Sequence, residues 1–185
     1  MEPSLEWTPL LASPVDLAVR LHVGPADPDL LLALQRASGR FIGEAGQPIV
    51  LVENDETWLS GKGSDTILLP AFPVIGTPTI EIDGGPVTDW EIGRKEGILR
   101  RKGGLWPDGL DNIHIKWTHG WAEIPADIQD AVLEQAETQF HAIAAIASTS
   151  AGGESITFSA QAALGVTNRW AEAVTRYRVG GGDDL

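Results

Sequence analysis

The apolar residues near the start of the chain recur with a helical period. In the stretch SPVDLAVRL, Ser13 can cap a helix whose first position is Pro14, and Asp27 with Pro28 can begin a second helix. One apolar stripe follows along this second segment: Leu30, Leu31, Leu34, Ala37, Phe41 and Ile42. The pattern predicts two helices over residues 1–46.

From residue 47 the pattern changes to short apolar runs broken by glycine, aspartate and proline, which is typical of strands. The runs lie at residues 48–61, 65–75, 77–92, 96–101 and 112–121. Because side chains alternate along a strand, Ile113, Ile115 and Trp117 should share one face of the last run. His114 and Lys116 should then lie on the other face.

Glycines mark several of the expected turns. Gly43 or Gly46 is placed to end the second helix. The sequence DGG at 83–85 follows an alternating run and predicts a tight hairpin. The sequence SGKGS at 60–64 lacks the spacing of a phosphate-binding loop and has no helical pattern after it, so we interpret it as the tip of a hairpin.

A third helical pattern begins near Pro125, which suits a first helical position. Its apolar residues are Ile128, Val132, Ala136, Phe140, Ile143 and Ala147. This predicts a long helix over residues 122–150. Beyond it, the sequence predicts an arm over 151–185, with an extended stretch from Ser155 to Ser159, a short helix from Asn168 to Tyr177 and a flexible end.

These elements together predict an α+β fold. Residues 1–46 and the long helix of 122–150 form a helical core, into which the antiparallel β-rich region of residues 47–121 is inserted. The arm of residues 151–185 follows this core.

The composition disfavours or excludes several functions. The formal net charge of −13 disfavours tight binding to a phosphate backbone, and the absence of cysteine excludes disulfides and thiol chemistry. No run of eighteen apolar residues occurs, and the first nineteen residues carry two glutamates where a secretory signal would carry Lys or Arg. We expect a soluble protein that is not exported and has no membrane partner.

Residues suited to catalysis or metal binding are present without a recognisable arrangement. The histidines at positions 22, 114, 119 and 141 lack metal-ligand spacing, and His114 and His119 should lie on opposite strand faces. The acidic stretches ENDE at 53–56 and PDGLDN at 107–112 lack the spacing of a calcium loop. No nucleophile elbow occurs. We therefore expect no metal, no cofactor and no catalysis.

Tryptophans and one basic segment remain to be explained. Trp90, Trp106, Trp117 and Trp121 gather in and around the predicted strands, where a core or subunit-interface role is favoured over stacking on sugars or bases. The basic run RKEGILRRK at 94–102 can meet phosphate, but a solvated hairpin whose charges discourage edge pairing is the favoured interpretation.

The order of these elements resembles the head-to-tail adaptor proteins of long-tailed bacteriophages. The likeness rests on the motif W-x-x-G-W-x-x-I-P-x-D-I-x-x-A-V at 117–132, on the early helix of 27–46 and on ESITFS and LGVTNRWAEAVTRYR near the end, which are similar to adaptors of actinobacteriophages. The motif residues are Gly120, Pro125, Asp127, Ile128, Ala131 and Val132. The strand-rich middle is larger than simpler, mostly helical adaptors require.

The resemblance implies a structural virion protein of the head-tail connector, or neck, made in the host cytoplasm. Such a protein binds the portal as a dodecameric ring, extends the DNA channel and receives a stopper or other neck or tail protein. DNA passes through the ring without specific binding, which agrees with the acidic composition. The alternatives are a stopper or tail-completion protein, or a carbohydrate- or ligand-binding β module.

Two sets of residues are candidates for interfaces in such a ring. Asp130, Glu134 and Glu137 lie in a stretch without Lys or Arg, and we expect them to face the channel or an adjacent subunit. Aromatic and guanidinium groups of the sort that carry interface energy gather near the end of the chain. These candidate portal-interface residues are Arg169, Trp170, Tyr177 and Arg178. Deleting residues 154–185 is then expected to leave a folded protein that no longer joins filled heads.

Overall fold

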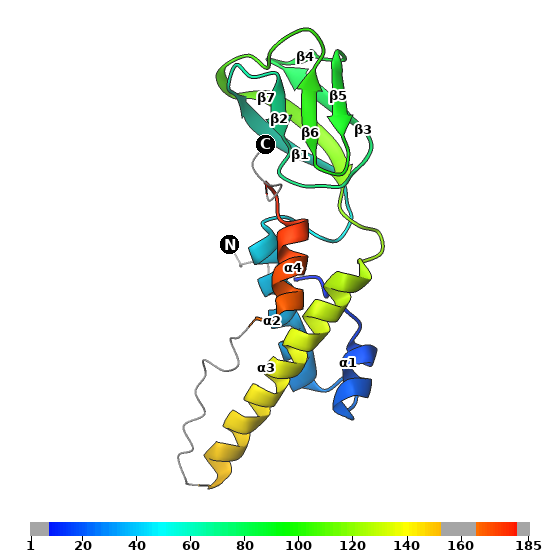
Figure 1. Cartoon of the computed structure of the whole chain (residues 1–185), viewed down its shortest axis with the longest axis vertical. Coiled ribbons are helices and arrows are strands. Elements are labelled where there is room, and N and C mark those ends of the chain that lie inside the picture. The colour runs from blue at the N-terminus through cyan, green and yellow to red at the C-terminus, as the bar shows by residue number, and fades with distance from the viewer. Residues whose placement is uncertain (1–7, 153–165, 181–185) are drawn as a thin grey trace, which may run out of the picture. The chain divides into compact units, whose positions relative to one another are not determined.

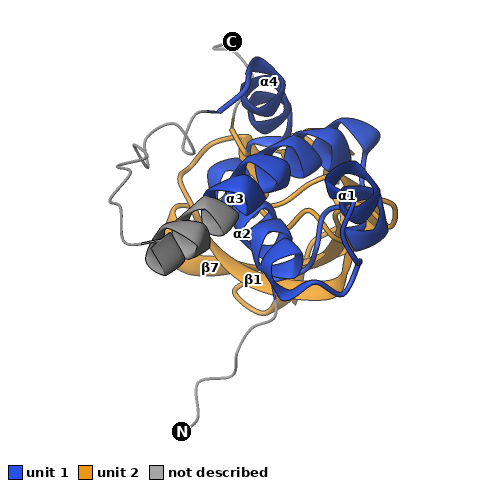
Figure 2. Ribbon diagram, turned by 90° about the horizontal axis from the view of Figure 1, so that it is seen from below, with its two compact units in different colours: residues 1–45, 124–178 blue, residues 46–123, 179–185 orange. Residues whose placement is uncertain are grey.

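The computed structural model describes residues 8–152 and 166–180, and the predicted extended stretch of residues 155–159 lies outside them. The chain divides into two compact units (Figure 2). Unit 1 comprises residues 1–45 and 124–178, and unit 2 comprises residues 46–123 and 179–185. Unit 1 is helical and unit 2 is built from antiparallel strands, so the predicted α+β class is confirmed.

The first two helices of unit 1 begin and end where local signals place them (Figure 1). Helix α1 spans Pro14–Leu21, and the Ser13 side chain accepts hydrogen bonds from the first-turn amides, as predicted. Helix α2 spans Pro28–Ala45, and the Asp27 carboxylate caps it by accepting from two amides at 2.9 and 3.1 Å. Gly46, at a φ of 70°, follows the last residue of α2, so the second of the two predicted glycines ends the helix.

Helix α3 spans Ala126–Gly152, and helix α4 spans Asn168–Tyr177. Pro125 lies one residue before α3 and not at its first position, where it was predicted. Its carbonyl accepts hydrogen bonds from the amides of Ile128 and Gln129 at 3.1 Å, so it begins the hydrogen bonding of the helix. None of the helices within the described residues is long and apolar enough to span a membrane.

The core of unit 1 is assembled from all four helices. Most residues of the two predicted apolar stripes have no exposed surface: Leu30, Leu34, Ala37 and Phe41 of α2, and Ile128, Val132 and Ala136 of α3. Leu31, Ile42 and Phe140, which were also predicted, are half-buried. The buried face of α2 also includes Ser38, whose hydroxyl accepts from the amide of Leu11 at 3.1 Å. This contact joins the segment before α1 to α2. The period of apolar positions does not predict it, because Ser38 is polar.

Unit 2 consists of two antiparallel sheets, which Figure 1 shows as separate layers of strands. The four-stranded sheet has the order β1-β7-β3-β4, and the three-stranded sheet has the order β2-β6-β5. The strands of the first sheet are β1 (Val52–Gly61), β7 (Gly109–His119), β3 (Val74–Ile82) and β4 (Gly85–Pro86). Those of the second are β2 (Thr66–Leu68), β6 (Ile98–Arg101) and β5 (Trp90–Gly93).

The turns of unit 2 confirm one prediction and correct another. Strands β3 and β4 pair around Asp83 and Gly84, both at positive φ, which is the tight hairpin predicted from DGG. The segment SGKGS at 60–64 is not a hairpin tip, because β1 pairs with β7 while β2 pairs with β6. It carries the chain from one sheet to the other. The local sequence does not show which strand each of its neighbours will pair with.

The core of unit 2 lies between the two sheets. Ile113, Ile115 and Trp117 point into it with at most 3% exposure, as their alternation predicts. Trp106 is fully buried and Trp90 packs against the same cluster, which agrees with a core role for these tryptophans. Side chains of opposite parity on the same strands therefore face outward, and these outward faces are available for interactions.

Candidate interaction surfaces

Helix α4 is held to the rest of unit 1 by one buried aromatic side chain. Trp170 is 1% exposed, and its ring packs against that of Phe41 in a T-shaped arrangement at a centroid distance of 5.3 Å. Its indole Nε1 donates to Oε2 of Glu44 at 2.7 Å, and the guanidinium of Arg40 lies 5.5 Å from the ring. The cap of α4 adds a further link, since the Thr167 hydroxyl accepts from the Trp170 amide and donates to Glu134.

The Glu44 carboxylate is the polar centre of this contact. It accepts from Trp170 and, at 2.7 Å, from Nε of Arg40 one helical turn earlier. Partial burial acts to raise the pKa of Glu44, but the hydrogen bonds from Trp170 and Arg40 and the Arg40 charge outweigh it, so the pKa is lowered. The ionised form of Glu44 therefore helps to fix α4.

A second polar contact joins the end of α4 to the start of α3. The Tyr177 hydroxyl donates to Asp127 at 2.9 Å, and Arg176 donates to the other oxygen of the same carboxylate at 2.7 Å. Burial, together with the hydrogen bond to Asp127 and its charge, raises the pKa of Tyr177 to about 12. Asp127 thus completes the docking of α4.

The predicted acidic face of α3 is partly neutralised by cations from other helices. Asp130 lies 3.5 Å from Arg20 of α1 and 4.0 Å from Arg169 of α4. Glu134 accepts from Thr167, and Glu137 is half-buried with no ion pair among the residues described. Of the three acidic residues, Asp130 is thus the one paired with arginines among the described residues, and these arginines come from α1 and α4, far from α3 in the sequence.

The four candidate portal-interface residues separate into two kinds. Arg169 has a side chain that is 62% exposed, and Arg178 at the end of α4 is also exposed. Trp170 and Tyr177 instead make contacts inside unit 1. Deleting residues 154–185 would remove Trp170 and uncover Phe41, so this deletion perturbs the helical core as well as any docking surface.

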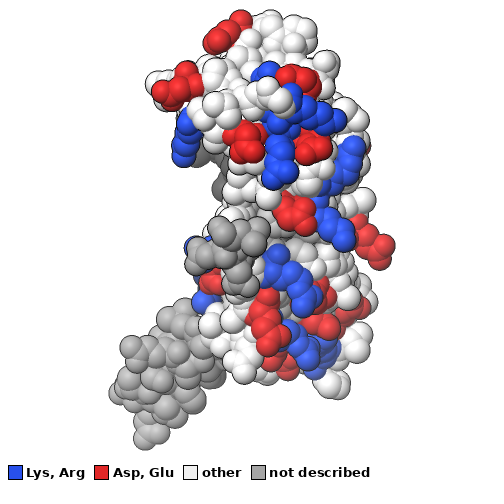
Figure 3. Space-filling view, turned by 45° about the horizontal axis from the view of Figure 1, so that its top comes forward, with Lys and Arg blue, Asp and Glu red and all other residues white. Residues whose placement is uncertain are grey.

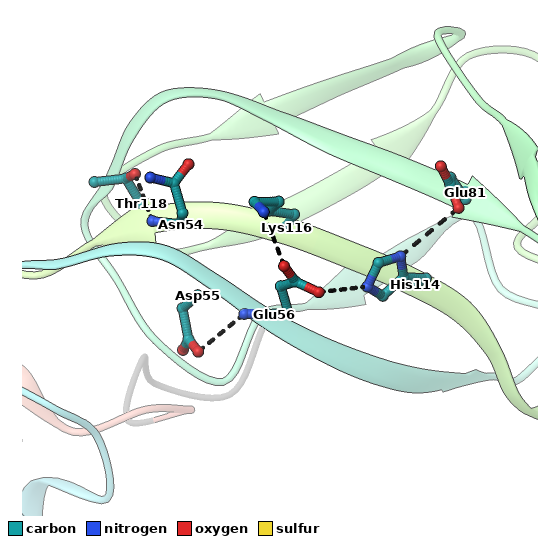
Figure 4. Close-up of polar contacts among 7 residues, drawn as sticks. All are labelled: Asn54, Asp55, Glu56, Glu81, His114, Lys116 and Thr118. Atoms are coloured by element: carbon teal, nitrogen blue, oxygen red, sulfur yellow. Dashed lines mark hydrogen bonds and ion pairs between the residues drawn. The ribbon is translucent and has the colours of Figure 1, made fainter.

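A second surface lies on the outer face of the four-stranded sheet (Figure 4). His114 of β7 lies between two carboxylates, with Nε2 3.5 Å from Glu56 of β1 and Nδ1 3.7 Å from Glu81 of β3. Lys116 donates to Glu56 at 2.8 Å, and this hydrogen bond and charge are the main causes that lower the pKa of Glu56. Trp58 stacks on His114 at a centroid distance of 4.5 Å and remains 56% exposed.

The other histidine of β7 lies inside unit 2. His119 has no exposed side chain, contacts Asp55 through Nε2 at 2.9 Å and stacks on Trp117. His114 and His119 are therefore on opposite faces, as the alternation predicts. Among the residues that the structure describes, no three His, Cys, Asp or Glu side chains are grouped as metal ligands.

The predicted basic hairpin forms between β5 and β6. Arg101 pairs with Asp89 at 2.8 Å and lies over the ring of Trp106, while Arg94 donates to the carbonyl of Gly76. Arg100 is 58% exposed and only loosely paired, at 3.9 Å from both of its acidic neighbours. Lys and Arg side chains, shown blue, gather on the face of unit 2 visible in Figure 3, with acidic residues between them.

Comparison with known proteins identifies the fold through solved structures alone. No family model and no curated protein matches the chain. A chain in the structure "Neck of native GTA particle computed with C12 symmetry" is 19% identical, with a TM-score of 0.50, and the match covers 100% of this chain and 97% of that one.

Two further structures of such particles match less well. "Neck of empty GTA particle computed with C6 symmetry" gives 20% identity and a TM-score of 0.49, covering 88% of this chain and 91% of that one. "Virion of native gene transfer agent (GTA) particle" gives 20% and 0.48, covering 88% and 82%. The chain thus shares, over its whole length, the fold of a chain found in the neck of a gene transfer agent particle.

Proposed function

We propose that the protein is a structural component of the neck of a phage-like particle, acting as a head-to-tail adaptor. The observation that carries this proposal is the likeness over the full chain to one chain of a gene transfer agent neck. In this role the chain binds the portal, extends the DNA channel and receives the next neck or tail component. The work is assembly, and none of these steps requires covalent chemistry.

The same likeness supports a ring of twelve copies, because that neck was computed with C12 symmetry. A closed ring needs two different, complementary surfaces on each subunit, so that each copy binds the next in the same way. A protein of this kind can remain a monomer until a portal ring offers a template.

In this proposal the end of the chain contacts the portal. Arg169 and Arg178 supply exposed guanidinium groups, which suit carboxylates and carbonyl oxygens on a partner. Trp170 and Tyr177 act by fixing α4 against α2 and α3, so that these cations project from a rigid element. Interface residues held this way lose less conformational entropy on binding.

Asp130, Glu134 and Glu137 are proposed to face the channel or the adjacent subunit. These three carboxylates outnumber the two arginines near Asp130, Arg20 and Arg169, so this part of unit 1 offers no excess of cations to hold DNA phosphates. Charges of both signs also suit a contact between copies.

The test is a mass measurement of the purified chain alone and mixed with portal rings of candidate phage-like particles. An adaptor gives a defined increase of mass on the portal ring, corresponding to a ring of chains. The charge reversal of Arg169 and Arg178 to Glu should abolish this increase, whereas Arg36→Glu, at an exposed arginine of α2, serves as the matched control. Absence of any complex with the tested portals would contradict the adaptor role. Equal attachment by all variants would contradict the proposed portal surface.

A ligand-binding β module is the second candidate, and the half-exposed Trp58 beside two carboxylates is the observation that favours it. Titration with soluble glycans, followed by tryptophan fluorescence, separates the two functions, because an adaptor should not respond. A stopper or tail-completion protein is the nearest alternative within the neck, and binding to the portal itself distinguishes the adaptor.

A further inference from the structure

Unit 2 presents two outward surfaces of different character on its two sheets. Strand residues next to those of the shared core point away from it, so the outer faces of the four-stranded and three-stranded sheets lie on opposite sides of the core. We call the first the acidic face; it consists of Glu56, Trp58, Thr79, Glu81, His114 and Lys116. We call the second the basic face; its strand residues are Thr66, Leu68, Glu91, Ile98 and Arg100, and the exposed Lys95 and Lys102 flank strand β6 in the sequence.

The acidic face combines carboxylates with an exposed indole. Its carboxylates are Glu56 and Glu81, and its lysine, Lys116, is paired with Glu56 at 2.8 Å. Trp58 is the largest apolar side chain on this face, and one side of its ring is already fixed by His114 while 56% of the residue is exposed. A planar cation fits beside such a ring, where the carboxylates of Glu56 and Glu81 can reach it.

The basic face offers cations and apolar side chains that can meet the carboxylates and the indole of the acidic face. Five of the thirteen Lys and Arg residues of the chain fall within residues 94–102. On β6, Arg100 is exposed and loosely paired, and Ile98 beside it is 41% exposed. Leu68, directly opposite Ile98 on β2, is 44% exposed, so the face offers a small apolar area next to cations.

We propose that the acidic face of one copy packs on the basic face of the next copy in the ring. The contact sets Arg100 and its neighbours against Trp58 and the carboxylates, and it lets Ile98 and Leu68 cover the exposed indole. Because the two faces are different and lie on opposite sides of the same unit, the contact is head-to-tail and leaves both ends open for further copies. Such contacts build rings when the rotation closes. This inference rests on the ring assembly proposed above.

Crosslinking between chosen positions tests the contact directly, because the chain has no cysteine of its own. Thr79→Cys places a thiol on the acidic face and Thr66→Cys places one on the basic face, and both leave every charge in place. The double variant, assembled on the portal and treated with a short bis-maleimide, should give a ladder of oligomers on a denaturing gel. Each single variant should stay monomeric, since its thiol then faces no other thiol.

The pattern of products separates the possible contacts. Dimers from Thr79→Cys alone would mean that two acidic faces meet, and this would overturn the proposal. The control pairs Thr79→Cys with Val19→Cys on α1, which is 70% exposed and outside both faces. A ladder of equal intensity from this control would show that the crosslinks are random, and would likewise remove the support for the contact.

Charge reversal gives a second, independent measurement. Glu81→Arg and Arg100→Glu should each abolish the mass increase on the portal ring, and their combination should restore it, because the pair is re-formed with opposite signs. Rings that form on the portal without crosslinks and without sensitivity to either reversal would overturn this contact while leaving the adaptor role intact. A chain that forms no ring under any condition would refute both.

Discussion

Replacing Trp170 by Phe tests how the end of the chain is fixed to the helical core. The substitution keeps an aromatic ring against Phe41 but removes the Nε1 donor that meets Glu44 at 2.7 Å. A hydrogen bond to a charged group contributes about 1.5–3 kcal/mol. The Glu44 side chain is 37% exposed and keeps Arg40 as a partner, so water and Arg40 replace part of the loss. We expect the free energy of unfolding of unit 1 to fall by about 1–2 kcal/mol.

Trp170→Ala removes the ring as well and should cost more. Truncating a buried tryptophan to alanine typically costs about 3–5 kcal/mol, because a cavity remains where the side chain packed. The residue is 1% exposed and lies against Phe41, so the full effect should apply here.

The assay is urea unfolding followed by helical circular dichroism, which reports unit 1 because unit 2 contains no described helix. Glu44→Ala serves as the partner variant in a double-mutant cycle with Trp170→Phe, because Gln at this position could still accept from the indole, and a coupling near the expected loss identifies the bond itself. If Trp170→Phe stays within about 0.5 kcal/mol of the parent, the range of ordinary surface substitutions, the contact contributes nothing and the reasoning is refuted.

The same unfolding experiment at acidic pH tests the contribution of the Glu44 carboxylate to stability. The pKa of Glu44 is lowered in the folded chain, so its contribution is present above the usual carboxyl range and is lost as the pH falls through the folded value. In Trp170→Phe one cause of the lowered pKa is missing. The stability lost on acidification should therefore be smaller in the variant than in the parent.

Three further substitutions or titrations test other contacts. Tyr177 is the only tyrosine, so tyrosinate absorbance reports its pKa of about 12 directly. Asp127→Asn should shift the titration midpoint toward the usual pKa of a tyrosine. A midpoint at that usual pKa in the parent protein would contradict the contact. The neutral form of Tyr177 is the one that the fold favours, so its contribution to stability is complete below the usual tyrosine pKa and is lost as the pH rises toward 12. Gly120→Ala places a Cβ 2.6 Å from the carbonyl oxygen of Val50 at a φ of 86°, and thermal unfolding should show a larger loss than in Gly63→Ala, where φ is also positive but the space is open. Asp27→Ala removes the cap of α2 and should cost about 0.5–2 kcal/mol by urea unfolding, and an unchanged midpoint would exclude a capping role.

The features that the sequence predicted well are those decided within a few residues. Ser13, Asp27 and Gly46 act on the nearest turn of helix, and the hairpin at Asp83 and Gly84 depends on two adjacent residues that tolerate positive φ. The burial of Ile113 follows from alternation along one strand. Each of these signals can be identified without knowing any distant contact.

The features that the sequence did not predict depend on residues far apart in the chain. Trp170 meets Glu44 across 126 positions, and Asp130 meets Arg20 across 110. The pairing of β1 with β7 instead of β2 is of the same kind, and it is why the segment at 60–64 was wrongly interpreted as a hairpin tip. Periodicity specifies which face of an element is apolar, but it does not specify which element covers that face.

The distribution of charge bears on how copies of this chain can meet. Unit 1 contains twelve Asp and Glu against six Lys and Arg, and unit 2 contains fourteen against seven, so both units are net negative. Two copies therefore repel each other at long range, and electrostatic attraction between them has to come from local patches in which cations meet carboxylates. Most of the cations of unit 2 fall within residues 94–102, which is where such a patch is found. Moderate salt should then favour assembly by screening the overall repulsion, whereas high salt should oppose it by weakening the patch itself. A contact driven by apolar burial alone would instead strengthen steadily as salt is raised.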